Sequence, residues 1–165
     1  MFQLSIDSIN QHSPYILSTS GAGLFCFTTD EGLIYEVGFV EDQMISIGNA
    51  YQFFLIPKSS SNVGKDEKMQ KTVTAIIEAF FESGDVLLDY ICDSNDGRQA
   101  ARSRLFSLWF NQYPKRNQFT LRTMSIVYEN ITYYASAIVR NDNPHYREYM
   151  KAIDDFEAEM REKLQ

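Results

Sequence analysis

Hydrophobic positions recur along this chain with two periods, one typical of strands and one typical of helices. Alternation with period two, or a short unbroken apolar run, indicates a strand, and recurrence at three- and four-residue spacing indicates an amphipathic helix. The pattern predicts strands at residues 24–28, 33–39, 51–56, 85–92, 119–128 and 131–139, and helices at 67–83, about 96–113 and 144 onward.

Turn and capping residues separate these elements. Asp30-Glu31-Gly32 joins the first two strands as a hairpin, and Glu129-Asn130 joins the last two, with Asn130 suited to a positive φ. Asn143 is expected to cap the last helix, with Pro144 in the first helical position.

The second predicted helix carries the densest set of signals. Asp96 and Gln99 have the spacing of a capping box, in which each side chain accepts or donates a hydrogen bond at the start of the helix. Phe106 is expected to lie off the buried side of this helix. The inward stripe is expected to consist of Ala101, Leu105, Leu108, Trp109 and Gln112.

The element order βββ-α-β-α-ββ-α groups the strands instead of alternating them with helices. Such grouping favours an α+β fold with a largely antiparallel sheet and helices packed against it. The strand at 85–92 is almost continuously apolar, which predicts a central place in the sheet. A length of 165 residues is that of one domain, so we expect residues 1–165 to form a single domain.

Charge is distributed unevenly along the chain. The net charge of −7 argues against general nucleic-acid binding. Residues 1–57 contain six acids and no Lys or Arg, whereas residues 97–128 contain six basic residues and no acid. The second region is therefore the candidate for an anion-binding face.

Four arginines are the candidate binding residues of that region. Arg98 and Arg102 are four residues apart and share a helix face, while Arg116 and Arg122 lie on the following loop and strand, from which they could return to the same side. Guanidinium groups bind carboxylates and phosphates in a bidentate manner. The alternative is that Arg98 and Arg102 pair with nearby acids of the chain itself, namely Asp85, Asp89 and Asp93.

Several site chemistries do not match the sequence. Residues 93–97, DSNDG, resemble a calcium loop, but the glycine is one position early and Arg104 stands where a glutamate ligand is needed. The same turn has one glycine, too few for a phosphate loop. His12 and His145 have no metal-ligating residue at suitable spacing. We therefore expect no metal and no cofactor.

An enzymatic alternative rests on Asp89, which lies among apolar residues of a strand. A buried carboxylate must be paired or hydrogen-bonded, and one with a perturbed pKa in a cleft can act in catalysis. Tyr128 or Tyr134 could serve as its acid/base partner in a pocket between sheet and helix.

The stretch from Tyr90 to Phe110, YICDSNDGRQAARSRLFSLWF, resembles a family of small bacterial proteins that is catalogued only as a domain of unknown function. The aromatic hairpin from Phe25–Thr29 to Tyr35–Phe39 is similar to the N-terminal half of that family. The resemblance extends over nearly the whole chain. It implies a small intracellular protein, with no established activity and no catalytic residue to assign.

The leading hypothesis is a non-enzymatic binding module whose basic face, residues 98–122, engages an acidic protein surface or a small anion. Self-association through the aromatic hairpin or the last helix is a third option. Cys26 and Cys92 form no disulfide framework, the N-terminus lacks a signal peptide, and no run approaches the roughly 20 apolar residues of a membrane span. We expect a soluble, cytoplasmic protein without membrane contact.

Overall fold

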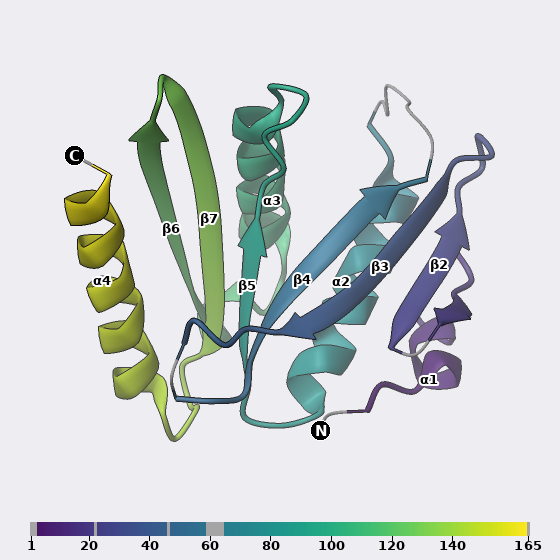
Figure 1. Ribbon diagram of the computed structural model, residues 1–165. Coiled ribbons are helices and arrows are strands. Elements are labelled where there is room, and N and C mark those ends of the chain that lie inside the picture. The colour runs from purple at the N-terminus through teal and green to yellow at the C-terminus, as the bar shows by residue number, and fades with distance from the viewer. Residues whose placement is uncertain (1–2, 22, 46, 59–64, 165) are drawn as a thin grey trace. The chain divides into compact units, whose positions relative to one another are not determined.

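The structure is a computed structural model that describes residues 3–21, 23–45, 47–58 and 65–164. It contains two compact units (Figure 1). Unit 1 consists of residues 1–40 and 53–84, and unit 2 consists of residues 41–52 and 85–165. The prediction that residues 1–165 form one domain stays a prediction.

Unit 1 is an antiparallel meander with one long helix. Its elements are α1 (Ile6–Asn10), β1 (Ser18–Gly21), β2 (Leu24–Thr28), β3 (Ile34–Glu41), β4 (Ala50–Pro57) and α2 (Glu67–Glu82), with strand order β1-β2-β3-β4. The sequence correctly predicted β2, β3, β4 and α2. It missed α1 and β1, because α1 is a single short turn and all four residues of β1 are exposed, so neither has a hydrophobic period.

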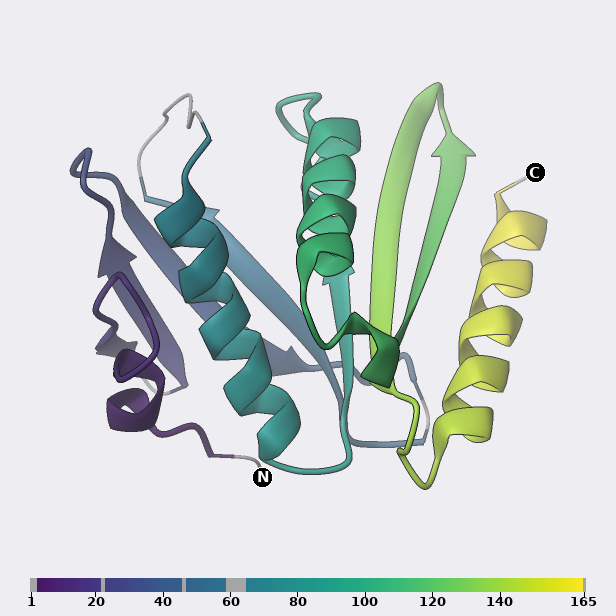
Figure 2. The same cartoon turned by 180° about the vertical axis from the view of Figure 1, so that it is seen from behind.

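Aromatic packing forms the core of unit 1. Phe27 stacks between Tyr15 and Tyr35, with ring centroids 5.8 and 5.6 Å apart. Phe39 stacks on Phe80 of α2 at 4.4 Å. The helix begins where the side chain of Asp66 accepts a hydrogen bond from the Met69 amide. In the view from behind, α2 lies over β3 and β4 (Figure 2).

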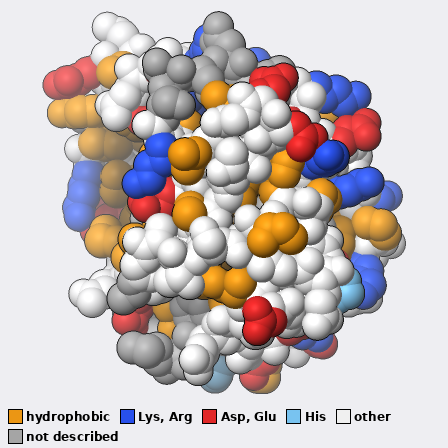
Figure 3. All heavy atoms as spheres, turned by 90° about the vertical axis from the view of Figure 1, so that its right-hand side faces the viewer, with side chains coloured by type: hydrophobic (Ala, Val, Ile, Leu, Met, Phe, Trp, Pro, Cys, Tyr) orange, Lys and Arg blue, Asp and Glu red, His pale blue; other side chains and the backbone are white. Residues whose placement is uncertain are grey.

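The side of unit 1 that carries β2 and α1 is shown in Figure 3. Hydrophobic side chains are visible there in separate places among polar and charged ones. Scattered apolar groups of this kind are normal on a protein surface and mark no particular site.

Unit 2 holds the start of β4 together with β5 (Leu87–Ile91), α3 (Gln99–Gln112), the short helix η1 (Arg116–Gln118), β6 (Phe119–Tyr128), β7 (Ile131–Arg140) and α4 (Tyr146–Lys163). Its strand order is β4-β5-β7-β6. β7 is antiparallel to both β5 and β6, and β5 is parallel to the start of β4. The fold class is therefore α+β with a mostly antiparallel arrangement of strands, and β5 has the interior position that its apolar sequence predicted.

The two long helices of unit 2 cover opposite faces of its strands (Figures 1 and 2). Successive strand residues point to opposite faces. On one face Leu87 packs with Tyr149 and Ile153 of α4. On the other face Tyr90 stacks on Phe106 of α3, with ring centroids 4.8 Å apart. Asp89, two residues from Leu87, consequently faces α4.

The predicted orientation of α3 is wrong. Ser103 and Phe106 are its buried residues, whereas Leu105 is 44% and Leu108 50% exposed. Apolar residues occur almost all around this helix, so periodicity alone could not select the inward side. The aromatic ring of Tyr90 selects Phe106.

The predicted capping box is also wrong. The helix begins at Gln99, after Arg98, with no side-chain cap. Asp96 accepts a hydrogen bond from the Arg98 amide and binds Arg102 instead. Gln99 donates through Nε2 to the Thr132 carbonyl of β7. Both side chains thus have tertiary or turn partners that displace the local cap.

Two turn predictions fared differently. Asn130 has the expected positive φ of 64°, and Glu129 has one of 49°, as a tight hairpin turn requires. The last helix begins at Tyr146, so Pro144 lies before it and not in its first turn. The Asn143 side chain accepts a hydrogen bond from the His145 amide.

None of the helices in the described residues is long and apolar enough to cross a membrane.

Candidate ligand pocket

The structure does not bring the four candidate arginines together. Arg98 precedes α3 and Arg102 lies in its first turn, while Arg116 lies in η1 beyond the other end. A 14-residue helix is about 21 Å long. Arg122 is on β6, on the face that α4 covers.

Arg102 and Arg122 bind carboxylates of the chain itself. Arg102 contacts the two Asp96 oxygens at 2.7 and 2.5 Å and the Asp93 carbonyl at 2.8 Å. This hydrogen bonding holds the pKa of the Asp96 carboxyl well below its usual range. Arg122 lies 2.5 Å from Asp154 and 4.0 Å from Glu157. Arg102 therefore does pair with an acid of the chain itself, but the predicted partners were wrong, because its carboxylate partner is Asp96 and it contacts only the backbone carbonyl of Asp93.

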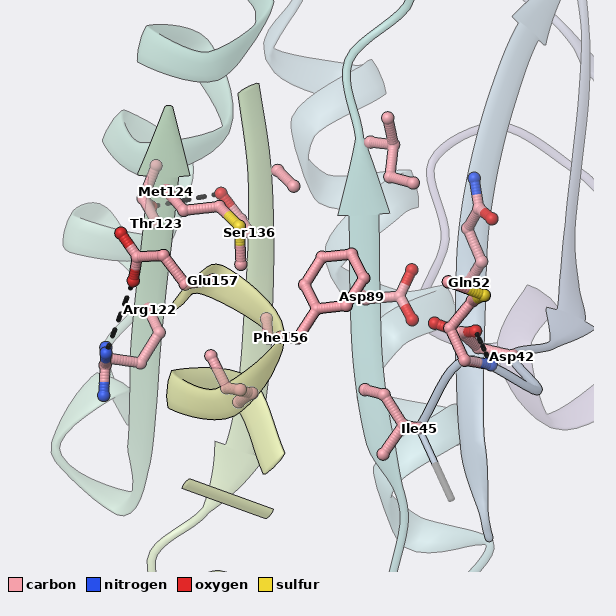
Figure 4. Close-up of a pocket in the computed structure, with 15 residues that line it drawn as sticks. Asp42, Ile45, Gln52, Asp89, Arg122, Thr123, Met124, Ser136, Phe156 and Glu157 are labelled. Carbon is pink, nitrogen blue, oxygen red and sulfur yellow. Dashed lines mark hydrogen bonds and ion pairs between the residues drawn. The ribbon is translucent and has the colours of Figure 1, made fainter. Parts of the chain in front are cut away.

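A pocket lies between α4 and the strands of unit 2 (Figure 4). Its cavity volume is about 130 Å³. Ala135 and Ala137 of β7 form part of its lining between β5 and β6, and Ile153 and Phe156 of α4 line it from the other side. Small residues on the middle strand leave space that the larger α4 side chains do not fill.

The strand register places opposite charges on either side of this space. Asp89 of β5 and Arg122 of β6 both pair with Ala137 of the strand between them. Neighbouring strands lie about 4.8 Å apart, so their backbones are separated by roughly 10 Å. Arg122 forms its ion pairs with α4, and Asp89 has no arginine partner among the residues that the structure describes.

Asp89 is 8% exposed, and neither of its carboxylate oxygens receives a hydrogen bond from a described residue. Its neighbour is Asp42, which follows β3 (Figure 4). The backbone holds Asp42 in place: its amide donates to the Ala50 carbonyl, and its Oδ1 accepts from the Met44 amide, both at 2.8 Å. Gln52 lines the same end of the pocket.

Burial raises the pKa of Asp89, and the neighbouring carboxylate of Asp42 raises it further, to about 8. Two ionised carboxylates that lie close together repel each other, which favours a proton on one of them. Asp89 therefore carries this proton at neutral pH. The pair resembles an acid–base couple that opens into a small apolar cavity.

The two candidate tyrosines do not lie at this pocket. Tyr134 points to the α3 side of β7, because Ala135 and Ala137 point to the α4 side. Tyr128 is at the hairpin turn, several residue pairs beyond the pocket, and is 42% exposed. Among the described residues that line the pocket there is no tyrosine.

Sequence reasoning identified Asp89 but missed Asp42, Gln52 and Phe156. Asp89 was visible as one acid within an apolar strand. Asp42 has no comparable signal, because it lies directly after a strand in an acidic segment, 47 positions before Asp89. Within the described part of the chain, no group of three His, Cys, Asp or Glu residues is placed to hold a metal ion.

The family model described as a family of unknown function (DUF6169) matches residues 65–157, and the chain belongs to this family. The match covers α2 to most of α4, including Asp89, and excludes the N-terminal hairpin and Asp42. Searches among curated proteins and solved structures found no match.

Proposed function

We propose that this protein is a non-enzymatic binding module that holds a small molecule in the pocket beside Asp89. The observation that carries the proposal is a carboxyl group that is more than nine-tenths buried, has no donor among the described residues and faces a cavity. Leaving a buried polar group unsatisfied costs about 1–3 kcal/mol. A ligand that supplies the missing partner recovers this free energy on binding.

The remainder of the pocket suits a small organic ligand. Ligand sites are mostly apolar and contain a few polar groups that orient the bound molecule. Here Met124, Ile153 and Phe156 contribute apolar surface. Polar groups lie at both ends of the pocket, with Asp42, Gln52 and Asp89 at one end and Arg122 and Glu157 at the other. An apolar cavity of about 150 Å³ is large enough to bind benzene, which sets the scale of the ligand.

The basic face remains a less well supported proposal for the same binding role. Arg98, Arg102, Arg116 and Arg122 would engage an acidic partner or a small anion. Arg102 and Arg122 already contact carboxylates of the chain, so an external anion has to compete with them. A reduced, cytoplasmic setting suits either proposal, because Cys26 and Cys92 are both free thiols.

A matched pair of variants tests the pocket. Ala135→Met places a larger side chain into the cavity, and Ala158→Met makes the same change on the exposed side of α4. A fragment library with cationic, neutral and anionic members is screened by backbone-amide NMR shifts. We expect some fragments to shift the amides of Asp89 and Ile153 in wild type and Ala158→Met, but not in Ala135→Met. If no fragment of any charge class shifts these amides, the proposal fails.

General acid–base catalysis by Asp89 and Asp42 is the second candidate function. A pKa of about 8 lies close to neutral pH, where a general acid or base is most efficient. Fragments that bind are incubated with wild type and Asp89→Asn and followed by mass spectrometry. Turnover that depends on Asp89 supports the enzyme, and binding without turnover supports the binding module.

A further inference from the structure

We propose that the ligand of this pocket carries a primary ammonium group, which binds between Asp89 and Asp42, and a compact apolar body that lies against Phe156. This inference rests on the proposed binding function and specifies its substrate class. It is carried by the charges, acceptors and apolar surfaces of the described residues around the cavity.

The charges around the pocket favour a cation. Its lining contains the acids Asp42, Asp89 and Glu157 and one base, Arg122. The guanidinium of Arg122 lies 2.5 Å from Asp154, so its charge is already balanced. At the opposite end, the carboxyl groups of Asp42 and Asp89 form no ion pair with any described residue (Figure 4). A cation placed there compensates the negative charge of Asp42 and that of Asp89 once Asp89 has ionised.

The acceptors at this end suit an ammonium group. An ammonium has three N–H donors and no acceptor. Asp89 and Asp42 supply carboxylate oxygens, and Gln52 adds an amide oxygen from the adjoining strand (Figure 4). The three donors of an ammonium group are thus matched by acceptors from three residues at this end of the pocket. An uncharged hydroxyl group brings a single donor and leaves most of these oxygens unsatisfied.

A hard metal ion fits the same place less well. Calcium takes six to eight oxygen ligands, and magnesium takes six in near-ideal octahedral geometry. The described residues offer two carboxylates and one amide here, with no third acid or histidine in a metal-binding group. Ile91, Met124 and Ile153 contribute apolar surface to the wall, which suits a hydrocarbon body better than a hydrated ion.

Phe156 provides the surface next to the proposed ammonium. Its ring lies in front of β5 beside Asp89 (Figure 4). A cation near the face of an aromatic ring gains about 0.5–2 kcal/mol. The ring also shields the charge pair from water, which strengthens the attraction between ammonium and carboxylate.

Binding of the ammonium group is coupled to loss of a proton. In the free protein at neutral pH Asp89 holds a proton, and the bound cation stabilises the ionised form, so this proton passes to the solvent. Affinity then rises with pH until Asp89 is already ionised in the free protein. A carboxyl that titrates near pH 8 makes binding about 50-fold tighter at pH 8 than at pH 6.

The experiment uses three probes of similar shape and different charge: benzylamine, benzyl alcohol and benzoate. Each probe is titrated into the isotope-labelled chain at pH 6, 7 and 8. Its affinity is read from the shifts of the backbone-amide NMR signals of pocket residues. Asp89→Asn is the test variant. Asp85→Asn is its matched control, because Asp85 is exposed and does not line the pocket.

We expect benzylamine to bind far more tightly than the other two probes and to show the 50-fold rise in affinity between pH 6 and 8. Asp89→Asn should weaken benzylamine binding at least tenfold and remove its pH dependence, whereas Asp85→Asn should behave as wild type. Equal binding of benzyl alcohol, or unchanged affinity in Asp89→Asn, overturns the ammonium inference.

Two further outcomes separate this inference from the proposed function. If benzyl alcohol or benzoate alone shifts the pocket amides, the binding function stands and the ammonium inference falls. If none of the three probes shifts them, both fall. Calcium chloride and magnesium chloride are titrated separately, and displacement of benzylamine by either metal ion overturns the ammonium assignment in favour of a metal site.

Discussion

The sharpest consequence of the buried acid pair is a dependence of stability on pH that Asp89→Asn removes. In the folded protein the pKa of Asp89 is raised to about 8, from a reference value of 3.8, by burial and by Asp42. Between these two values the folded state holds a proton that the unfolded state has released. The stabilising contribution is therefore complete below about pH 4 and is lost as pH rises toward 8.

The size of the effect follows from the width of this window. Each pH unit inside it lowers the free energy of unfolding by about 1.4 kcal/mol. Raising the pH from 5.5 to 8 crosses 2.5 units and should cost about 3 kcal/mol. Asparagine cannot ionise, and its side chain is close in size and shape to a protonated carboxyl. Asp89→Asn should thus lose none of this stability over the same range.

Urea denaturation at several pH values between 5.5 and 8.5 measures the effect, with far-UV circular dichroism and Trp109 fluorescence as probes. All other ionisable groups are present in both proteins, so their contributions cancel in the comparison. Asp42→Asn removes the neighbouring charge and should end the fall in stability at a lower pH. Parallel stability curves for wild type and Asp89→Asn would refute the reasoning.

Three further predictions concern packing, hydrogen bonding and thiol chemistry. Phe106→Ala should lower the free energy of unfolding by about 3 kcal/mol and Leu108→Ala by about 0.5 kcal/mol or less, because only Phe106 is buried. Urea denaturation measures both values, and equal losses would contradict the orientation of α3. Tyr149→Phe should lower the free energy of unfolding by about 1 kcal/mol in the same assay, because the Tyr149 hydroxyl donates a hydrogen bond to the Gly48 carbonyl at 2.8 Å. An unchanged denaturation midpoint would count against that hydrogen bond. Burial raises the pKa of the Cys92 thiol to about 11. Iodoacetamide at pH 8 should therefore modify Cys26 in the native protein and Cys92 only after unfolding. Rapid labelling of Cys92 in the native protein, detected by peptide mass spectrometry, would contradict this.

Local sequence was sufficient to predict most elements of this fold. The strands at 24–28 and 119–128 have the predicted bounds, and α2 ends within one residue of its predicted end. In each case a regular hydrophobic period ends at a turn or capping residue. Short elements without such a period, α1 and β1, were missed for the same reason.

Orientation and partner choice were not accessible from local pattern. α3 has apolar residues on several sides, and only the ring of Tyr90 determines that Phe106 faces inward. Asp96 and Gln99 have capping-box spacing, but Arg102 and the Thr132 carbonyl bind them more favourably. A charge-assisted bidentate contact is roughly twice as strong as a neutral hydrogen bond, so it outweighs the local cap.

The sequence by itself determined the α+β class, the family, the apolar strand that buries Asp89 and the basic character of residues 97–128. These properties depend on neighbouring residues and on composition. Only the tertiary structure decided that the arginines do not converge, and that Asp89 meets Asp42 across 47 positions of sequence beside a cavity bounded by Ala137. The physical reason is that strand register and helix packing set distances between remote side chains, and these distances decide which carboxylate finds an arginine and which one keeps a proton.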